Sequence, residues 1–159
     1  MTGSRTTAGA FQEAQLPVRA KLAVAWTSFM FLYAYVDILA FYKPGVVDDI
    51  LVGVVHDFET GPTFVALALT LMAIPSLMIL LSTTLPARVN RATNLVVATL
   101  YIPVSMYNVA GEESWNYSYF YGLSIGLEVL LLAFILRAAW TWPRTTRATV
   151  EHAPVRVHA

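Results

Sequence analysis

The chain has 159 residues, of which 57% are hydrophobic and 13% are charged. Soluble domains are about one quarter charged, so this composition excludes an ordinary soluble domain and favours a protein whose main partner is the lipid bilayer. Ten basic and ten acidic residues leave no net charge, so we expect no nucleic-acid partner. The absence of cysteine excludes disulfides and thiolate metal sites.

Four apolar stretches are long enough to cross a membrane as helices, since a bilayer core of about 30 Å needs about 20 apolar residues. They are residues 22–42, 63–85, 93–110 and 119–142. Aromatic residues near their ends, such as Tyr42 and Trp140, are typical of the headgroup level. The sequence therefore predicts an all-α fold, an integral membrane four-helix bundle with up-down topology that spans the inner (plasma) membrane several times.

Polar segments flank these stretches. We expect residues 1–20 to form a flexible cytoplasmic N-terminal arm, residues 21–142 to form the four-helix domain, and residues 143–159 to form a cytoplasmic tail. The loop between the first two stretches contains an apolar and acidic run, residues 46–52, that predicts a short helix at the membrane surface. Two interpretations of this loop stay open, a simple cover of the bundle and a surface that contacts a partner.

The basic residues are distributed unevenly between the two sides of the predicted bundle. Lys43 is the only one on the side of the first loop. The other side holds nine, namely Arg5, Arg19, Lys21, Arg88, Arg91, Arg137, Arg144, Arg147 and Arg156. Because cytoplasmic flanks of membrane helices are enriched in lysine and arginine, both termini are predicted to be cytoplasmic.

Several kinds of site are disfavoured by the position of the few candidate ligands. The three histidines, His56, His152 and His158, lie outside the apolar stretches, so they cannot hold a haem between helices. Acidic residues surround His56, but their spacing matches no known metal site. We therefore predict neither a cofactor nor a metal. No phosphate-binding glycine loop or nucleophile elbow is present, and whether the protein is an enzyme stays open.

Polar residues recur at helical spacing inside three of the apolar stretches. In lipid, such residues mark the helix faces that turn toward neighbouring helices, and intramembrane acids are candidates for function. From the rise of a helix, Glu128 should lie about 15 Å and Asp37 about 8 Å below the membrane surface nearer the first loop. The predicted pocket between the helices is lined by Tyr33, Asp37, Tyr101, Ser105, Asn108, Tyr121, Ser124 and Glu128.

Two prolines, Pro75 and Pro103, share the pattern I-P-x-x-M in consecutive apolar stretches. Proline removes one helical hydrogen bond, so Pro75 should leave the carbonyl of Leu71 with a free acceptor position. Paired kinks can mark a binding site near the middle of the membrane. Kinks that serve only helix packing explain the same pattern, and both interpretations stay open.

Short motifs in a fixed order resemble those of a family of small bacterial integral membrane proteins of unknown function with four helices. The motifs are YVD at 35–37, Gly53, PSLM at 75–78, LLS at 80–82, RATN at 91–94, Glu128 and Trp140. The resemblance implies the four-helix architecture, and it implies that Asp37, Asn94 and Glu128 belong to a shared pattern. It implies no activity.

Three functional hypotheses follow. In the first, the polar pocket binds or transports a small ligand or a proton. In the alternative, the protein is a structural or accessory subunit of a membrane complex, as a homo-oligomer or with another partner, and the polar residues only join helices. In the third, a lipid-modifying membrane enzyme uses Glu128 as a base with Tyr101 as its partner.

The charge asymmetry makes a prediction about topology. Reporter fusions after residue 159 and at Pro62 are expected to report opposite sides of the membrane, with the C-terminus in the cytoplasm. A fusion after residue 142 serves as a control, because it should agree with the fusion at residue 159. Reports from the same side for residue 159 and Pro62 would contradict the topology.

Overall fold

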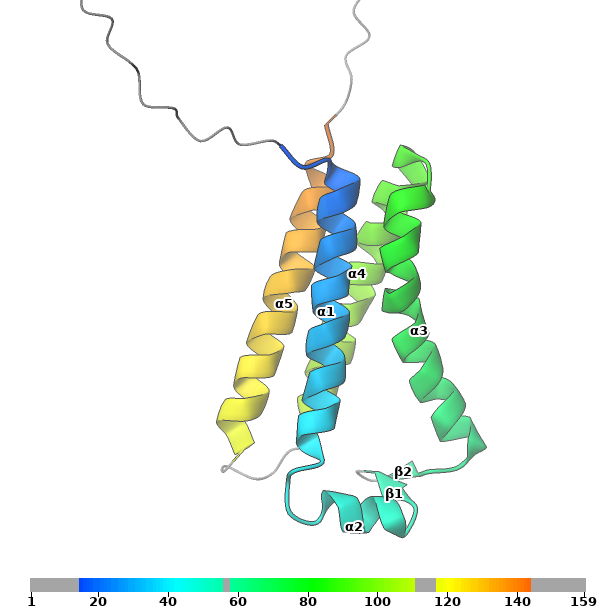
Figure 1. Cartoon of the computed structure of the whole chain (residues 1–159), viewed down its shortest axis with the longest axis vertical. Helices are drawn as coiled ribbons and strands as arrows, with labels where there is room; N and C mark the ends of the chain where they lie inside the picture. The colour runs from blue at the N-terminus through cyan, green and yellow to red at the C-terminus, as the bar shows by residue number, and fades with distance from the viewer. Residues whose placement is uncertain (1–14, 56–57, 111–116, 144–159) are drawn as a thin grey trace, which may run out of the picture.

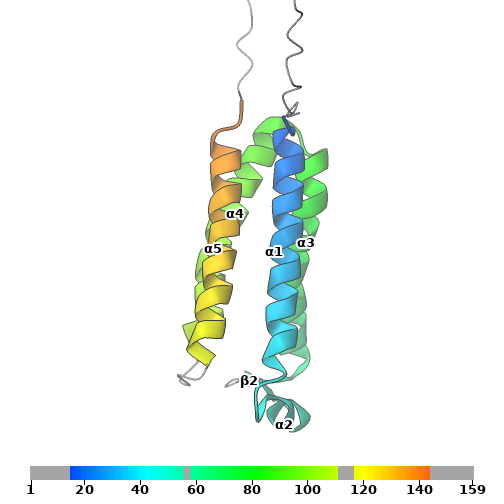
Figure 2. The same cartoon turned by 60° about the vertical axis from the view of Figure 1, so that its left-hand side comes forward.

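The computed structural model describes residues 15–55, 58–110 and 117–143, apart from the side chains of 108–110. Four long helices lie side by side (Figures 1 and 2), namely α1 (Val18–Ala40), α3 (Pro62–Thr84), α4 (Ala87–Ala110) and α5 (Ser118–Trp140). A short helix, α2 (Val46–Leu51), and an antiparallel pair of strands, β1 (Val54–Val55) and β2 (Phe58–Glu59), lie beyond the ends of α1 and α3. The predominantly helical prediction is confirmed.

The four long helices alternate in direction. Helix α1 packs on α3 and α5, and α4 packs on α5, whereas α3 and α4 share a smaller contact. Both described ends of the chain lie beside the turn between α3 and α4 (Figure 1). We call this the basic end, because it carries Arg19, Arg88, Arg91 and Arg137, and we call the opposite end, where α2, β1 and β2 form a cap, the cap end. The side of the membrane that each end faces stays a prediction.

Among the described residues, three helices are long and apolar enough to cross a membrane, namely α1, α3 and α5. Helix α4 has 24 residues but is less apolar, because its first two turns contain Arg88, Asn90, Arg91 and Asn94. It also begins six positions before the predicted stretch 93–110. The apolar pattern misses these turns because their polar side chains form contacts at the basic end. A fourth membrane span therefore stays a prediction.

Two glycines shape the cap. Gly45 precedes α2 with φ 88° and Gly53 follows it with φ 85°, a left-handed conformation that side chains with a Cβ rarely adopt. The amide of Thr60 donates to the carbonyl of Gly53 at 2.8 Å and closes the loop around β1 and β2. The short helix predicted at 46–52 is thus present, whereas the strand pair was not predicted. Strands of two residues are too short to show the alternation of apolar and polar residues by which a sequence predicts a strand.

The interior near the middle of the helices is aromatic. The ring of Phe29 lies 5.7 Å from that of Trp26 and 5.8 Å from that of Tyr101, both in edge-to-face geometry. Tyr33 stacks on Phe29 at 5.8 Å. Much of the outer surface is formed by exposed leucine, valine and phenylalanine, which suits helices that face lipid.

Hydrogen bonds of Asn94 join three helices near the basic end. The indole Nε1 of Trp26 on α1 donates to Asn94 Oδ1 at 2.7 Å, and the Asn94 amide donates to the backbone and side-chain oxygens of Asn90. Asn90 Nδ2 in turn donates to the carbonyl of Ser82 on α3 at 2.6 Å. All four side chains are fully buried. We call Trp26, Ser82, Asn90 and Asn94 the Asn94 network.

Two arginines bind the carbonyl ends of neighbouring helices. Arg19 on α1 donates to the carbonyl of Thr83 in the last turn of α3 at 2.8 Å. Arg91 on α4 donates to the carbonyl of Ala139 on α5 at 3.2 Å and lies over the ring of Trp140. Because the last carbonyls of a helix lack internal partners and carry partial negative charge, these contacts stabilise the basic end.

Replacing Asn94 with alanine is expected to lower the free energy of unfolding by about 1–3 kcal/mol, because the Trp26 indole N–H loses its buried acceptor and the side-chain oxygen of Asn90 loses its buried donor. Unfolding by SDS in mixed micelles measures this change. Thr99→Ala is the matched control, since Thr99 bonds only within its own helix and is exposed. Equal losses for the two variants would show that the Asn94 network does not hold the helices together.

Candidate functional site

Glu128 lies in the middle of α5 and is 4% exposed, and it is the only buried acid among the described residues. Its carboxyl faces the hydroxyl of Ser105 on α4 and interacts electrostatically with Asp37 on α1. Three helices therefore contribute to its surroundings. The sequence placed Glu128 deeper than Asp37, and the fold nevertheless brings both acids and Ser105 close enough to interact.

The hydroxyl of Ser105 is buried beside this carboxyl. Ser105 is 1% exposed, and within the described part of the chain its Oγ forms no hydrogen bond of ordinary geometry, although Glu128 is its neighbour. The carboxyl of Glu128 is the polar group that interacts with this hydroxyl, so two buried polar groups meet between α4 and α5.

Asp37 lies closer to the cap end than the sequence indicated. Helix α1 ends at Ala40 rather than Tyr42, so Asp37 is only about 4.5 Å along the axis from the helix end. Its side chain is exposed on the surface of α1 while it still acts on Glu128. One turn deeper, Tyr33 is buried and interacts with Tyr101 on α4.

Tyr101 bonds to a backbone carbonyl that a proline leaves free. Its hydroxyl donates to the carbonyl of Leu71, the residue four positions before Pro75 in α3. The free acceptor predicted from Pro75 is thus present and occupied. This bond occupies the donor of the Tyr101 hydroxyl, whose oxygen can still accept a hydrogen bond, so the pairing of Tyr101 with Glu128 in the enzyme hypothesis stays a prediction.

Two predicted pocket residues form other contacts. The hydroxyl of Tyr121 accepts a hydrogen bond from Lys43 Nζ at 2.9 Å, and Ser124 Oγ donates to the carbonyl of Tyr121 at 3.0 Å. Both lie nearer the cap end than Glu128 on the same helix. The side chain of Asn108 lies outside the described residues. The predicted pocket residues other than Tyr121 and Asn108 are called the polar seam below. They are Tyr33, Asp37, Tyr101, Ser105, Ser124 and Glu128.

Sequence reasoning missed two residues that the structure makes important. Asn90 lay before the start of the predicted stretch, yet its spacing of four from Asn94 places both on one helix face. Lys43 was treated only as the lone base of its side, whereas its ammonium lies over the rings of Tyr117 and Tyr121. The sequence signal for this contact was a single lysine in the first loop together with three tyrosines at 117, 119 and 121.

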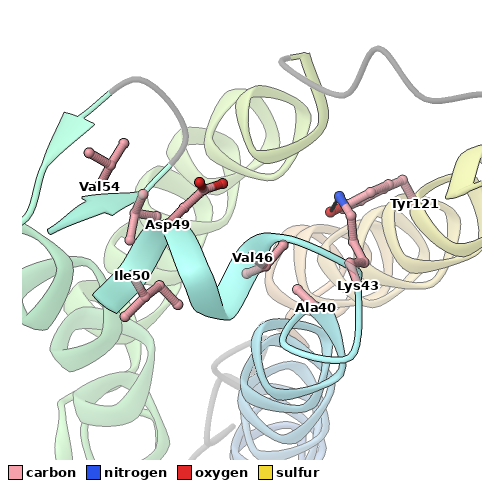
Figure 3. Close-up of a pocket in the computed structure, with 8 residues that line it drawn as sticks. Ala40, Lys43, Val46, Asp49, Ile50, Val54 and Tyr121 are labelled. Atoms are coloured by element: carbon pink, nitrogen blue, oxygen red, sulfur yellow. Dashed lines mark hydrogen bonds between the residues drawn. The ribbon is translucent and has the colours of Figure 1, made fainter. Parts of the chain in front are cut away.

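A pocket of about 200 Å³ lies at the cap end, between α2 and the start of α5 (Figure 3). Tyr121 lines it, and Glu128 does not. Among the described residues, no group of three or more histidines and acids gathers to hold a metal ion.

Comparison with known proteins places the chain in a family. Residues 12–149 match the model of the family of unknown function DUF6326, and the chain belongs to this family. The match includes every motif on which the resemblance rested. No curated protein and no solved structure matches the chain.

Proposed function

We propose that this member of the DUF6326 family is a membrane-embedded binding or transport protein in which Glu128 carries a proton or contacts a small cationic ligand. The observation that supports this proposal is the buried carboxyl group of Glu128 where α1, α4 and α5 meet. It interacts with the neutral hydroxyl of Ser105 and with a second acid, Asp37. The four long helices span the inner membrane, with the basic end in the cytoplasm.

The energetics of a buried acid support this proposal. Removing a carboxylate from water is costly unless it is paired or protonated, so intramembrane acids are rarely retained without a role. A proton or a cation held between two acids reduces the repulsion between their charges. Asp37 lies close enough to act electrostatically on Glu128.

The positions of the two acids suggest a route of entry. Asp37 is exposed near the cap end, whereas Glu128 is buried deeper, so a proton or cation would meet Asp37 first and Glu128 second. The aromatic cluster of Trp26, Phe29 and Tyr101 lies between this site and the basic end. This order of the groups supports entry from the cap end, with the aromatic cluster on the side of the basic end.

An accessory subunit is the second candidate, and a specific observation favours it. Tyr101 and Ser124 both donate to backbone carbonyls inside the protein, as polar residues do when they only join or brace helices. The exposed apolar surface of α3 would then pack on a partner protein or on a second copy of the chain.

Isosteric variants distinguish the two candidates. In proteoliposomes with an imposed membrane potential, the parent is expected to carry protons, measured with a trapped pH-sensitive dye, or to bind tetraphenylphosphonium as a cationic probe. Glu128→Gln should abolish either activity, and Asp37→Asn should weaken it, because both remove the charge and keep the shape. Glu59→Gln, an exposed acid on β2, is the matched control and should match the parent.

The accessory candidate predicts a different pattern. Both isosteric variants would be silent, and only Glu128→Leu would be costly, by about 1–2 kcal/mol of unfolding free energy through lost interhelical bonds. A parent protein with neither proton flux nor probe binding above empty liposomes would contradict the binding or transport proposal. A Glu128→Gln variant that matches an active parent would contradict the role of Glu128.

A further inference from the structure

We propose that the pocket at the cap end is a separate binding site for a small zwitterion that carries an ammonium group and an acid group. The pocket encloses about 200 Å³ between α2 and the start of α5 (Figure 3). Neither Asp37 nor Glu128 lines it, so this site does not depend on the function proposed for the polar seam.

One side of the pocket is suited to an anion. Lys43 is the only basic residue between Lys21 and Arg88, and its ammonium donates to the hydroxyl of Tyr121 at 2.9 Å. It also lies 4.8 Å from the centre of the Tyr121 ring, which orients it. Because the Tyr121 oxygen accepts this bond, its own O–H can donate to a ligand. A positive charge and a hydroxyl donor therefore meet at one wall.

The opposite side carries a negative charge. Asp49 on α2 lines the same pocket, and Figure 3 shows Asp49 and the Lys43–Tyr121 pair on either side of Val46. The turn before α2 and the first turn of this helix separate the two side chains along the pocket wall (Figure 3).

The rest of the lining is apolar. Val46 lies between the two charged side chains (Figure 3), and Ile50, Val54 and Val55 complete the lining, which suits the short carbon chain of a small zwitterion. A simple anion would be repelled by Asp49 and a simple cation by Lys43, so the arrangement selects a ligand with both charges. Primary amines that also carry a phosphate or carboxylate belong to this class.

Such a ligand can come from the aqueous phase or from a lipid headgroup. The rim of the cap includes Tyr42, Leu51 and Val52, whose side chains are about four-fifths exposed at 82%, 78% and 78%. Exposed apolar side chains at this level suit contact with acyl chains. The test therefore needs one arm for each source.

The soluble arm titrates O-phosphoethanolamine into the full chain in phosphatidylglycerol nanodiscs, measured by isothermal titration calorimetry. The lipid arm measures retention of phosphatidylethanolamine after detergent exchange, by native mass spectrometry. The parent is expected to bind in at least one arm, and the arm that responds identifies the source. Asp49→Asn and Tyr121→Phe should each weaken binding by about tenfold, the size of one lost charge-assisted hydrogen bond.

Asp48→Asn is the matched control, because Asp48 is the neighbouring acid on α2 and does not line the pocket; it should bind like the parent. Circular dichroism and gel filtration establish that each variant folds, and Asp49 is exposed, so its variant tests the site even if the Tyr121 variant fails to fold. Absence of saturable binding in both arms would overturn the proposal. So would equal affinity for glycerol 3-phosphate, or equal losses in Asp48→Asn and Asp49→Asn.

Discussion

The hydrogen bonds of Asn94 are the interaction on which the arrangement of the helices depends. Between helices in lipid there is little hydrophobic driving force, so packing and polar contacts decide which faces meet. The side-chain oxygen of Asn94 accepts a hydrogen bond from the Trp26 indole on α1, and the Asn94 amide donates to Asn90. Asn90 in turn donates to the Ser82 carbonyl near the end of α3. With Arg19 and Arg91 bound to the carbonyl ends of α3 and α5, the basic end is joined across all four long helices.

The cap end is held differently, and the candidate sites lie in that half. In Figure 1, α3 leans away from α4 toward the cap end, in keeping with their small contact. Tyr101 bridges them through the Leu71 carbonyl that Pro75 leaves free, and beyond this bridge lie Ser105, Glu128 and Asp37.

The sequence could predict the features that depend on local pattern. Apolar length indicated the helices, helical spacing placed Ser105 and Glu128 on helix faces that turn toward neighbouring helices, and proline chemistry indicated the Leu71 acceptor. It could not predict features that only tertiary contacts create. The polar start of α4 is helical because Asn90 and Arg91 find partners on other helices, and Lys43 reaches Tyr121 across 78 positions of sequence. That a pocket lies beside Tyr121 follows from the same long-range contact.

The proposed entry from the cap end predicts that water reaches the polar seam, and cysteine labelling tests this most directly because the chain has no native cysteine. Ser105→Cys and Ser124→Cys would be treated in sealed vesicles with a charged thiol reagent that cannot cross the membrane, applied from the cap side. Ser82→Cys, equally buried but in the Asn94 network, is the reference. The account predicts labelling at 105 and 124 and none at 82. Seam cysteines as unreactive as the one at 82 would show a dry, structural seam and contradict the account.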